Sequence, residues 1–475
     1  MLFNSLEFAV FFPLVTLLYF LLPGRARVPL LLLASCWFYM AFVPAFILVL
    51  LGVILIDYTA GLLIEKAIGR RRKILLGCSI VANVGLLAFF KYFVFLRGGV
   101  DAIAGLIGAA APFPALHVIL PIGLSFHTFQ SMSYTMEVYR GHVPAERSLA
   151  HFALYVLFYP QLVAGPIERP QNLLPQFRIT HSFDLDRCLD GLKLIATGLF
   201  KKVIIADRLA PIVDAAYSAP REHSGGQLLL ATYLFAIQIY CDFSGYSDIA
   251  RGAARVMGFE LMQNFNRPYF ATSIGEFWRR WHISLSTWFR DYVYIPFGGN
   301  RTGRGRRCAN QLVVFVLSGI WHGANWTFLV WGLIHGLIMA GEIAVRGDRP
   351  ERAPTGLRAL VRGLLVFNVV ALAWVFFRAA SLDDAALILR RIFTAFAAPA
   401  AAWHHSALQL ATALALIAAL FLAERLGRDR PVWERIAALP RWQRWGAYYL
   451  FALAFVVLAL TGPQQTAQPF IYFQF

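Results

Sequence analysis

Apolar residues along the chain gather in long runs, and short polar or basic segments separate one run from the next. Many runs approach the ~20 apolar residues that a helix needs to cross a bilayer. The pattern predicts an all-α polytopic membrane protein with roughly ten transmembrane helices. No intervening segment is long enough to fold alone, so we expect one membrane domain over residues 1–475. The expected spans include Phe8–Leu22, Val28–Phe42, Ala45–Leu63, Ile74–Leu96, Val118–Met136, Leu228–Tyr240, Leu364–Phe377, Leu408–Leu422 and Tyr448–Leu460.

Composition supports a membrane location. Hydrophobic residues make up 59% of the chain and charged residues 15%, whereas a soluble domain is roughly half apolar and a quarter charged. The formal net charge of +17 is of the kind that polytopic proteins place in cytoplasmic loops. The basic residues lie between apolar runs and form no nucleic-acid-binding module. We therefore expect contact with membrane lipids and none with nucleic acid.

The first apolar run differs from a cleaved secretory signal. It carries Glu7, its first following basic residue is Arg25, and no small-residue cleavage site follows it. A retained span is therefore expected. The five cysteines show no paired spacing, and no histidines or acids have the spacing of metal ligands on a helix. The sequence predicts neither a disulfide framework nor a metal site.

Basic residues between the runs predict which loops face the cytoplasm. Arg25 and Arg27 follow the first run, which places the N-terminus outside. The cluster Arg70–Lys73 and the arginine-rich segment Glu424–Trp445 are expected inside. One further span then leaves the final segment Gly462–Phe475 outside. Both ends of the chain are thus predicted on the external side.

The stretch SGIWHGANWTFLVWGLIHG, Ser318–Gly336, does not fit simple alternation, because basic clusters lie on both sides of it. A segment with both flanks in the cytoplasm cannot cross once. It enters and returns, or it breaks into two short arms around Trp321–Trp326, where Gly323 and Asn325 are weak helix formers. Irregular backbone at membrane depth needs protein or water around it. We expect re-entrant or interfacial helices around a central polar cavity, with His322 at the turning point.

Two further groups of polar residues interrupt the apolar pattern. Helical periodicity places Gln238 and Asp242 on one helix face. It places Arg279, His282 and Ser286 along one stripe, at i, i+3 and i+7. Both groups have a structural interpretation as well as a functional one. Asp242 can pair with a lysine or arginine inside the bundle, and Arg279 can anchor an interfacial helix.

Imidazole changes protonation near neutral pH, so a histidine in a restricted cavity suits general base catalysis. This reasoning leaves His322 and His282 as candidate catalytic residues. His335 lies thirteen residues beyond His322, about 20 Å along a straight helix. The two therefore need not share a site, and we interpret His335 as a hydrogen-bonded packing residue.

Short motifs spread along the chain include YCDFSGYSD (Tyr240–Asp248), FNRPYF (Phe265–Phe270), FWRRWHISLSTW (Phe277–Trp288), RDYVYIPFGGN (Arg290–Asn300), SGIWHGANW (Ser318–Trp326), LPIGLSFHTFQ (Leu120–Gln130), VAGPIER (Val163–Arg169) and PFIYFQF (Pro469–Phe475). Together they resemble the membrane-bound O-acyltransferase family, and within it the bacterial branch of alginate O-acetylation proteins. The resemblance extends in order over almost the whole chain. One departure is His127, where an aromatic residue such as tyrosine is expected.

The resemblance implies acyl transfer through a membrane, with the family's invariant histidine at His322 and its second functional histidine at His282. An acetyl group from cytoplasmic acetyl-CoA would pass across a bacterial inner membrane to an exported polysaccharide such as alginate. A periplasmic acetyltransferase or esterase-like partner protein would complete the transfer. No tightly bound cofactor is expected.

A hydroxyl that attacks a thioester must lose a proton, which His322 could accept, and Asn325 or His282 could stabilise the oxyanion. The candidate substrate-binding residues are Asn325, Asp242, Ser286 and Arg279. Three alternatives remain open. D-alanyl transfer to teichoic acid uses related chemistry, and a non-catalytic scaffold of a polysaccharide secretion complex would need polar clusters only for packing. A transporter is also possible, although the chain has no detectable inverted repeat.

Overall fold

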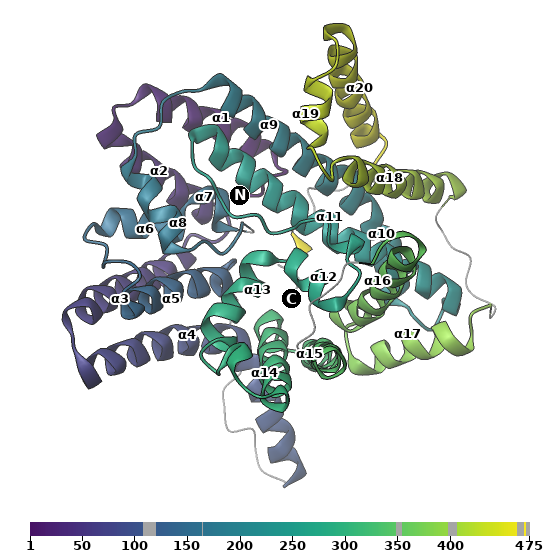
Figure 1. The fold of residues 1–475 in the computed structure, drawn as a ribbon, viewed down its shortest axis with the longest axis horizontal. Coiled ribbons are helices and arrows are strands. Elements are labelled where there is room, and N and C mark those ends of the chain that lie inside the picture. The colour runs from purple at the N-terminus through teal and green to yellow at the C-terminus, as the bar shows by residue number, and fades with distance from the viewer. Residues whose placement is uncertain (108–119, 164, 348–353, 398–405, 463–469, 472–475) are drawn as a thin grey trace.

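The computed structural model describes residues 1–107, 120–163, 165–347, 354–397, 406–462 and 470–471, and the regular elements in these ranges are all helical (Figure 1). The all-α prediction is confirmed. The first half contains α1 (Leu6–Leu21), α2 (Gly24–Met40), α3 (Phe46–Lys66), α4 (Gly69–Leu106), α5 (Leu124–Arg140), α6 (Leu149–Leu157), α7 (Tyr159–Leu162), α8 (Pro170–Leu173), η1 (Leu174–Arg178), α9 (Leu185–Leu199), η2 (Phe200–Ala206), α10 (Asp207–Ser218) and α11 (Gly225–Met257). The second half contains η3 (Pro268–Phe270), α12 (Ile274–Arg280), α13 (Ile283–Phe289), η4 (Arg290–Tyr294), η5 (Gly299–Arg301), α14 (Arg304–His322), α15 (Trp326–Arg346), α16 (Gly356–Arg378), α17 (Leu382–Thr394), α18 (Ala407–Leu426), α19 (Val432–Ala437) and α20 (Arg441–Leu460).

Seven helices of the described chain are long and apolar enough to cross a membrane, namely α3, α4, α11, α15, α16, α18 and α20. The sequence predicted roughly ten. The difference arises where an apolar run folds into a short helix, because a run does not show where its helix ends. α1 and α2 have 16 and 17 residues, and the 17-residue α5 buries polar side chains along most of its length. The chain is a multi-pass membrane protein.

Helix α11 forms the centre of the fold. In the most apolar stretch of α11, 83% of the residues are buried, whereas the corresponding stretch of α20 has 0%. Helix α20 projects from the body together with α19 (Figure 1). The neighbouring α9 crosses α11 at backbone contact. An added Cβ on Gly198 would lie 2.4 Å from the carbonyl oxygen of Gly245, and one on Gly191 would lie 2.7 Å from that of Gly252. Small residues allow helices in membranes to approach this closely.

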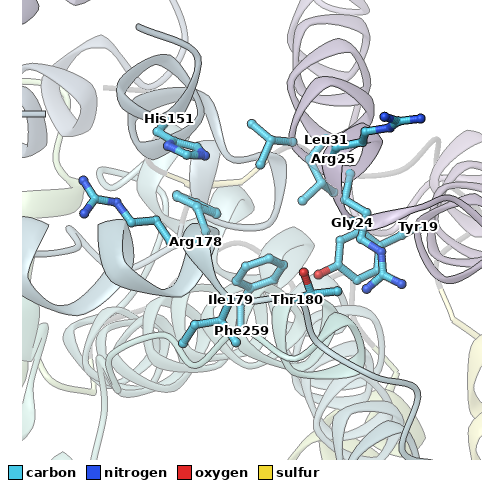
Figure 2. Close-up of a pocket in the computed structure, with 12 residues that line it drawn as sticks. Tyr19, Gly24, Arg25, Leu31, His151, Arg178, Ile179, Thr180 and Phe259 are labelled. Atoms are coloured by element: carbon cyan, nitrogen blue, oxygen red, sulfur yellow. The ribbon is translucent and has the colours of Figure 1, made fainter. Parts of the chain in front are cut away.

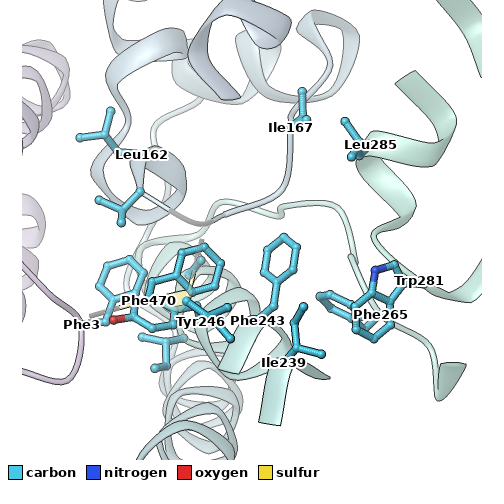
Figure 3. Packing of buried hydrophobic residues seen from close by; sticks show 14 of the residues in the cluster. Phe3, Leu162, Ile167, Ile239, Phe243, Tyr246, Phe265, Trp281, Leu285 and Phe470 are labelled. Atoms are coloured by element: carbon cyan, nitrogen blue, oxygen red, sulfur yellow. The ribbon is translucent and has the colours of Figure 1, made fainter. Parts of the chain in front are cut away.

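Both ends of the described chain pack against α11 (Figure 3). The ring of Tyr246 lies 5.8 Å from that of Phe3 and 4.9 Å from that of Phe470, measured between centroids. Phe3 and Phe470 are therefore neighbours of one residue, as expected if both ends lie on one side of the membrane. Of the final segment that was predicted outside, the structure describes only Gly462, Phe470 and Ile471, and the rest lies outside the described residues.

Helices α14 and α15 form an antiparallel hairpin around a break at Gly323–Asn325. The two backbones touch, since an added Cβ on Gly319 would lie 2.4 Å from the carbonyl oxygen of Phe328. At the open end of the hairpin, Arg304 lies against Gly347. The basic flanks are thus neighbours, as expected of a segment that folds back on itself. Its arms, of 19 and 21 residues, are longer than the short arms that the sequence suggested.

Candidate active site

His322 is the last residue of α14, and the extended backbone of Gly323 ends the helix directly after it. The imidazole is buried, with 6% of the residue exposed. Its ring centroid lies 5.0 Å from that of Trp321, 5.1 Å from that of Trp331 and 5.1 Å from that of Phe377. Aromatic rings of α14, α15 and α16 therefore surround it, whereas the sequence predicted a central polar cavity.

His282 combines an unusual backbone conformation with a buried imidazole. Its backbone is left-handed, with φ 42° and ψ 55°, and it forms the N-cap of α13. Only 1% of the residue is exposed, and neither ring nitrogen has a hydrogen-bond partner in the described part of the chain. An unpaired buried polar group costs about 1–3 kcal/mol, and such costs concentrate at sites where function needs them.

The indole ring of Trp321 lies close to both His322 and His282. The ring centroid of Trp321 lies 5.0 Å from that of His322 and 6.3 Å from that of His282. The two imidazole centroids are therefore separated by no more than the sum of these distances, which is inside the ~12 Å that one water-bridged site allows. The structure thus brings together two residues that are far apart in the sequence.

The predicted stripe of Arg279, His282 and Ser286 is wrong, because no single helix carries all three. Helix α12 ends at Arg280 and α13 begins at Ile283. The left-handed backbone of His282 separates the two helices and turns the chain. Ser286 donates a hydrogen bond of 3.1 Å to the carbonyl of Trp281, so its hydroxyl supports this turn.

Glu342 of α15 holds the start of α12. Its carboxylate accepts hydrogen bonds of 2.8 Å from the backbone N–H of Ile274 and 3.1 Å from that of Gly275. Arg279 lies on the same side of α12, since its guanidinium and the Glu342 carboxylate both approach Gly275. The anionic cap ties α12 to the hairpin that carries His322, and it suits the positive end of a helix dipole.

Asn325 and Asp242 both have partners within the protein. Asn325 is the N-cap of α15, where its side-chain oxygen accepts a bond of 3.1 Å from the N–H of Thr327, and its nitrogen donates one of 3.0 Å to the carbonyl of Ala380. Asp242 pairs with the buried Lys202 at 2.6 Å, the ion pair that the sequence allowed. Contact of either residue with substrate stays a prediction.

His335 packs among rings on α15, fully buried, and Trp278 donates a hydrogen bond of 3.4 Å to its Nδ1. This is the packing role that the sequence indicated. His127 is also buried, 6.2 Å from the ring of Tyr39. No group of three histidines, cysteines or acids that could hold a metal ion occurs within the described ranges, and the sequence predicted no metal site.

The residue that sequence reasoning missed is Lys91 of α4. Its ammonium donates hydrogen bonds of 2.7 Å to the carbonyl oxygens of both Trp321 and His322. The next residue, Tyr92, donates its hydroxyl to the carbonyl of Ile320. A signal was present in the sequence, because a lysine inside the predicted span Ile74–Leu96 is costly and demands a partner.

Comparison with known proteins decides the family. A family model described as the membrane-bound O-acyltransferase family matches residues 113–382, more than half of the chain. The chain belongs to this family. The matched segment of the acyltransferase contains His282, His322 and Asp242, whereas Lys91 lies before it.

Curated relatives of the acyltransferase carry names of acetyl-transferring enzymes. "Probable alginate O-acetylase" from Azotobacter vinelandii is 44% identical over 393 residues, which cover 81% of this chain and 76% of the relative. The protein of the same name from Pseudomonas putida is 38% identical over 500 aligned positions, with both chains covered completely. "Peptidoglycan O-acetyltransferase" from Helicobacter pylori is 36% identical over 425 residues, covering 82% and 79%. The protein is therefore an O-acyltransferase enzyme of the alginate O-acetylase-like type.

A separate cavity of about 300 Å³ lies between the start of α2 and η1, away from the acyltransferase histidines, and its lining includes Arg25, Arg27, Arg178 and His151. Figure 2 shows the side chains of Arg25 and Arg178 extending away from Phe259. Arg178 is already paired at 2.6 Å with Glu146. Burial opposes ionisation of Glu146, but the Ser148 backbone and the Arg178 guanidinium together lower its pKa. The charge of Arg178 is therefore matched within the protein.

Proposed function

We propose that this enzyme transfers acetyl groups from cytoplasmic acetyl-CoA across the bacterial inner membrane, for O-acetylation of an exported polysaccharide such as alginate. His322 is the catalytic base. One observation carries the proposal: His322 stands at the turn of a membrane hairpin, with a second histidine across a shared indole. The relatives named for alginate and peptidoglycan O-acetylation support acetyl as the acyl group and a polysaccharide as the final acceptor.

The chemistry follows from this arrangement. A hydroxyl oxygen attacks the carbonyl carbon of the thioester, and His322 removes the hydroxyl proton as the new C–O bond forms. The C–S bond then breaks, and the sulfur leaves as a thiolate that takes up the proton. His282 or the amide of Asn325 stabilises the oxyanion of the intermediate. Since the rings around His322 exclude water, competing hydrolysis of the thioester is suppressed.

Basic residues and the predicted topology support the choice of acyl donor and of partner protein. Arg301, Arg304 and Arg307 stand at the open end of the hairpin or just before it, on the side that the charge pattern predicts to be cytoplasmic. They attract the phosphates of acetyl-CoA. A periplasmic acetyltransferase or esterase-like protein receives the acetyl group on the other side and places it on the polysaccharide.

The test compares His322→Gln and His322→Ala with His335→Ala. Neither change at His322 adds charge to the membrane, so both proteins should insert. Acetylation of the exported polymer should fall by ~10²–10⁴-fold, the usual contribution of general base catalysis. His335→Ala should lower the amount of folded protein more than the activity per molecule, because His335 packs between rings. Polymer acetylation and the membrane level of each variant are measured together.

Normal acetylation by well-expressed His322→Ala protein would overturn the role of His322 as the catalytic base. A separate measurement identifies the acyl group and the acceptor. Mass spectrometry of the exopolysaccharide, the peptidoglycan and any teichoic acid, from cells with and without the protein, distinguishes acetyl ester from D-alanyl ester. An acetyl ester on exopolysaccharide is expected. D-alanine on teichoic acid would replace the proposal by the alternative.

A further inference from the structure

Lys91 joins α4 to the end of the helix that carries His322. Its Nζ atom lies 2.7 Å from each of the carbonyl oxygens of Trp321 and His322, and 5.8 Å from the ring centroid of Trp321. The Tyr92 hydroxyl donates to the carbonyl of Ile320. Two adjacent residues of α4 thus hold three successive carbonyls at the end of α14.

These carbonyls need partners for a physical reason. The last carbonyls of a helix have no N–H partner within the helix. In a bilayer water does not supply one, so an unsatisfied carbonyl there is costly. A cation at this position also meets the negative end of the helix dipole. Lys91 therefore stabilises the break that leaves His322 as the final residue of α14.

Helix α4 is itself held in register by hydrogen bonds to α3. Ser79 and Asn83 donate hydrogen bonds of 2.6 Å and 2.9 Å to the buried carboxylate of Asp57 on α3. Ser79 and Asn83, four residues apart, share one face of α4, and at about 100° per residue Lys91 lies roughly 80° further around the helix than Asn83. The contacts with α3 therefore fix the rotation of α4 that presents Lys91 to α14.

The surroundings of His322 contain few charges. Among the described residues, the titratable groups that face it are Lys91 from α4 and His282 from the start of α13. On α15 the nearest titratable group is His335, beyond the ring of Trp331, and α16 presents the uncharged Phe377. The ammonium of Lys91 is thus a cationic group that faces the imidazole from α4.

We propose that Lys91 is a positioning residue of the acyl-transfer site, which fixes the backbone of His322 and keeps its imidazole neutral. The inference rests on the proposed role of His322 as the base. Burial among the rings already disfavours the imidazolium form, and a nearby positive charge disfavours it further. The base therefore stays available at lower pH than it would without Lys91.

A lysine that only capped the helix end would make the same hydrogen bonds as Lys91. Another basic helix cap in this chain therefore serves as a control. Arg208 donates hydrogen bonds to the carbonyl of Leu458 at 2.5 Å and to the hydroxyl of Thr461 at 3.4 Å, at the end of α20. That helix carries none of the candidate site residues. Arg208→Met removes a basic cap from a membrane helix that does not carry His322. Tyr92→Phe removes an uncharged hydrogen-bond donor of α4 that caps the end of α14.

The experiment measures acetyl transfer from acetyl-CoA by membrane vesicles that carry the full-length protein, as a function of pH, per molecule of folded protein. Lys91→Met should lower kcat by about tenfold or more with little change in KM, because the base is misplaced. It should also move the acidic limb of the pH profile upward, by on the order of one pH unit. The sign follows because the imidazole now protonates more easily and the neutral form is lost at higher pH. Lys91→Arg should restore the position of the limb.

Tyr92→Phe should lower activity without moving the acidic limb, and Arg208→Met should lower the amount of protein and leave the limb in place. A Lys91→Met protein that loses activity with an unmoved limb would overturn the proposal and reduce Lys91 to a helix cap. The His322→Gln variant separates this failure from that of the proposed function. If His322→Gln remains active, His322 is not the base. If it is inactive while the limb of Lys91→Met stays in place, only the positioning role fails.

Discussion

The carboxylate of Asp242 holds the backbone of Ile471, whose N–H donates a hydrogen bond of 2.8 Å to Oδ2. The other oxygen, Oδ1, lies 2.6 Å from the ammonium of Lys202, which also pairs with Asp207 at 2.7 Å. One side chain in the middle of α11 therefore ties a buried ion pair to a residue near the end of the sequence. This explains why Phe470 and Ile471 are buried.

Asp242→Ala should destabilise the protein strongly. The change leaves Lys202 with one carboxylate and the N–H of Ile471 without its acceptor, and breaking a buried pair costs about 3–5 kcal/mol. Thermal unfolding in detergent measures the loss. Asp248→Ala is the matched control on the same helix, because its pairs with Lys201 and Arg251 are more exposed and should contribute less. Unchanged stability of Asp242→Ala with lost acetylation would instead support substrate binding by Asp242.

His282→Asn should remove the imidazole and keep the left-handed backbone at this position. Asparagine tolerates the left-handed conformation better than most residues, so the variant should fold and insert normally. Acetylation should still fall by about tenfold or more, because the imidazole is absent, although less completely than for His322→Gln. His282→Ala should show the same loss together with lower stability. Full acetylation by a well-folded His282→Asn protein would remove His282 from the reaction.

Gly319→Ala should separate the two arms of the hairpin. The added methyl group would lie 2.4 Å from the carbonyl oxygen of Phe328, and overpacking of this kind costs about 1–3 kcal/mol. Both the amount of folded protein and its activity should fall. Gly341→Ala on α15 is the control, since nothing lies within 4 Å of its added methyl. Equal behaviour of the two variants would contradict close packing at Gly319.

Cysteines introduced near Met1 and near Gln465 should both react with an impermeant thiol reagent added to intact cells, after the five native cysteines are replaced by alanine. The charge pattern predicts that both ends lie outside, and Phe3 and Phe470 contact the same tyrosine. Labelling after denaturation checks that each cysteine is reactive. If only one site reacts in intact cells, the number of crossings has the wrong parity and the charge assignment fails.

The sequence predicted those features that depend on one segment at a time. Gly323 and Asn325, with basic residues on both flanks, were enough to predict the hairpin and the place of His322 at its turn. The left-handed backbone of His282 was not visible, because FWRRWHIS contains neither glycine nor proline and reads as one helix. The break there depends on packing by other helices. Lys91 was missed because its partners lie 230 and 231 residues away in the sequence, and no local pattern contains that pairing.

The close contact between α14 and α15 has a consequence for biogenesis. The first turn of α14 is rich in arginine, and the charge rule predicts that this turn stays in the cytoplasm. We therefore expect that α14 does not remain in the bilayer alone. Glycines on both helices bring the backbones together, and each arm shields the other from lipid along the seam. We expect the insertion machinery to accept residues 304–346 as one unit, late enough for α15 to have left the ribosome. If translation paused after α14, this helix would lack its packing partner α15. We expect membrane quality-control proteases to degrade such an incomplete hairpin.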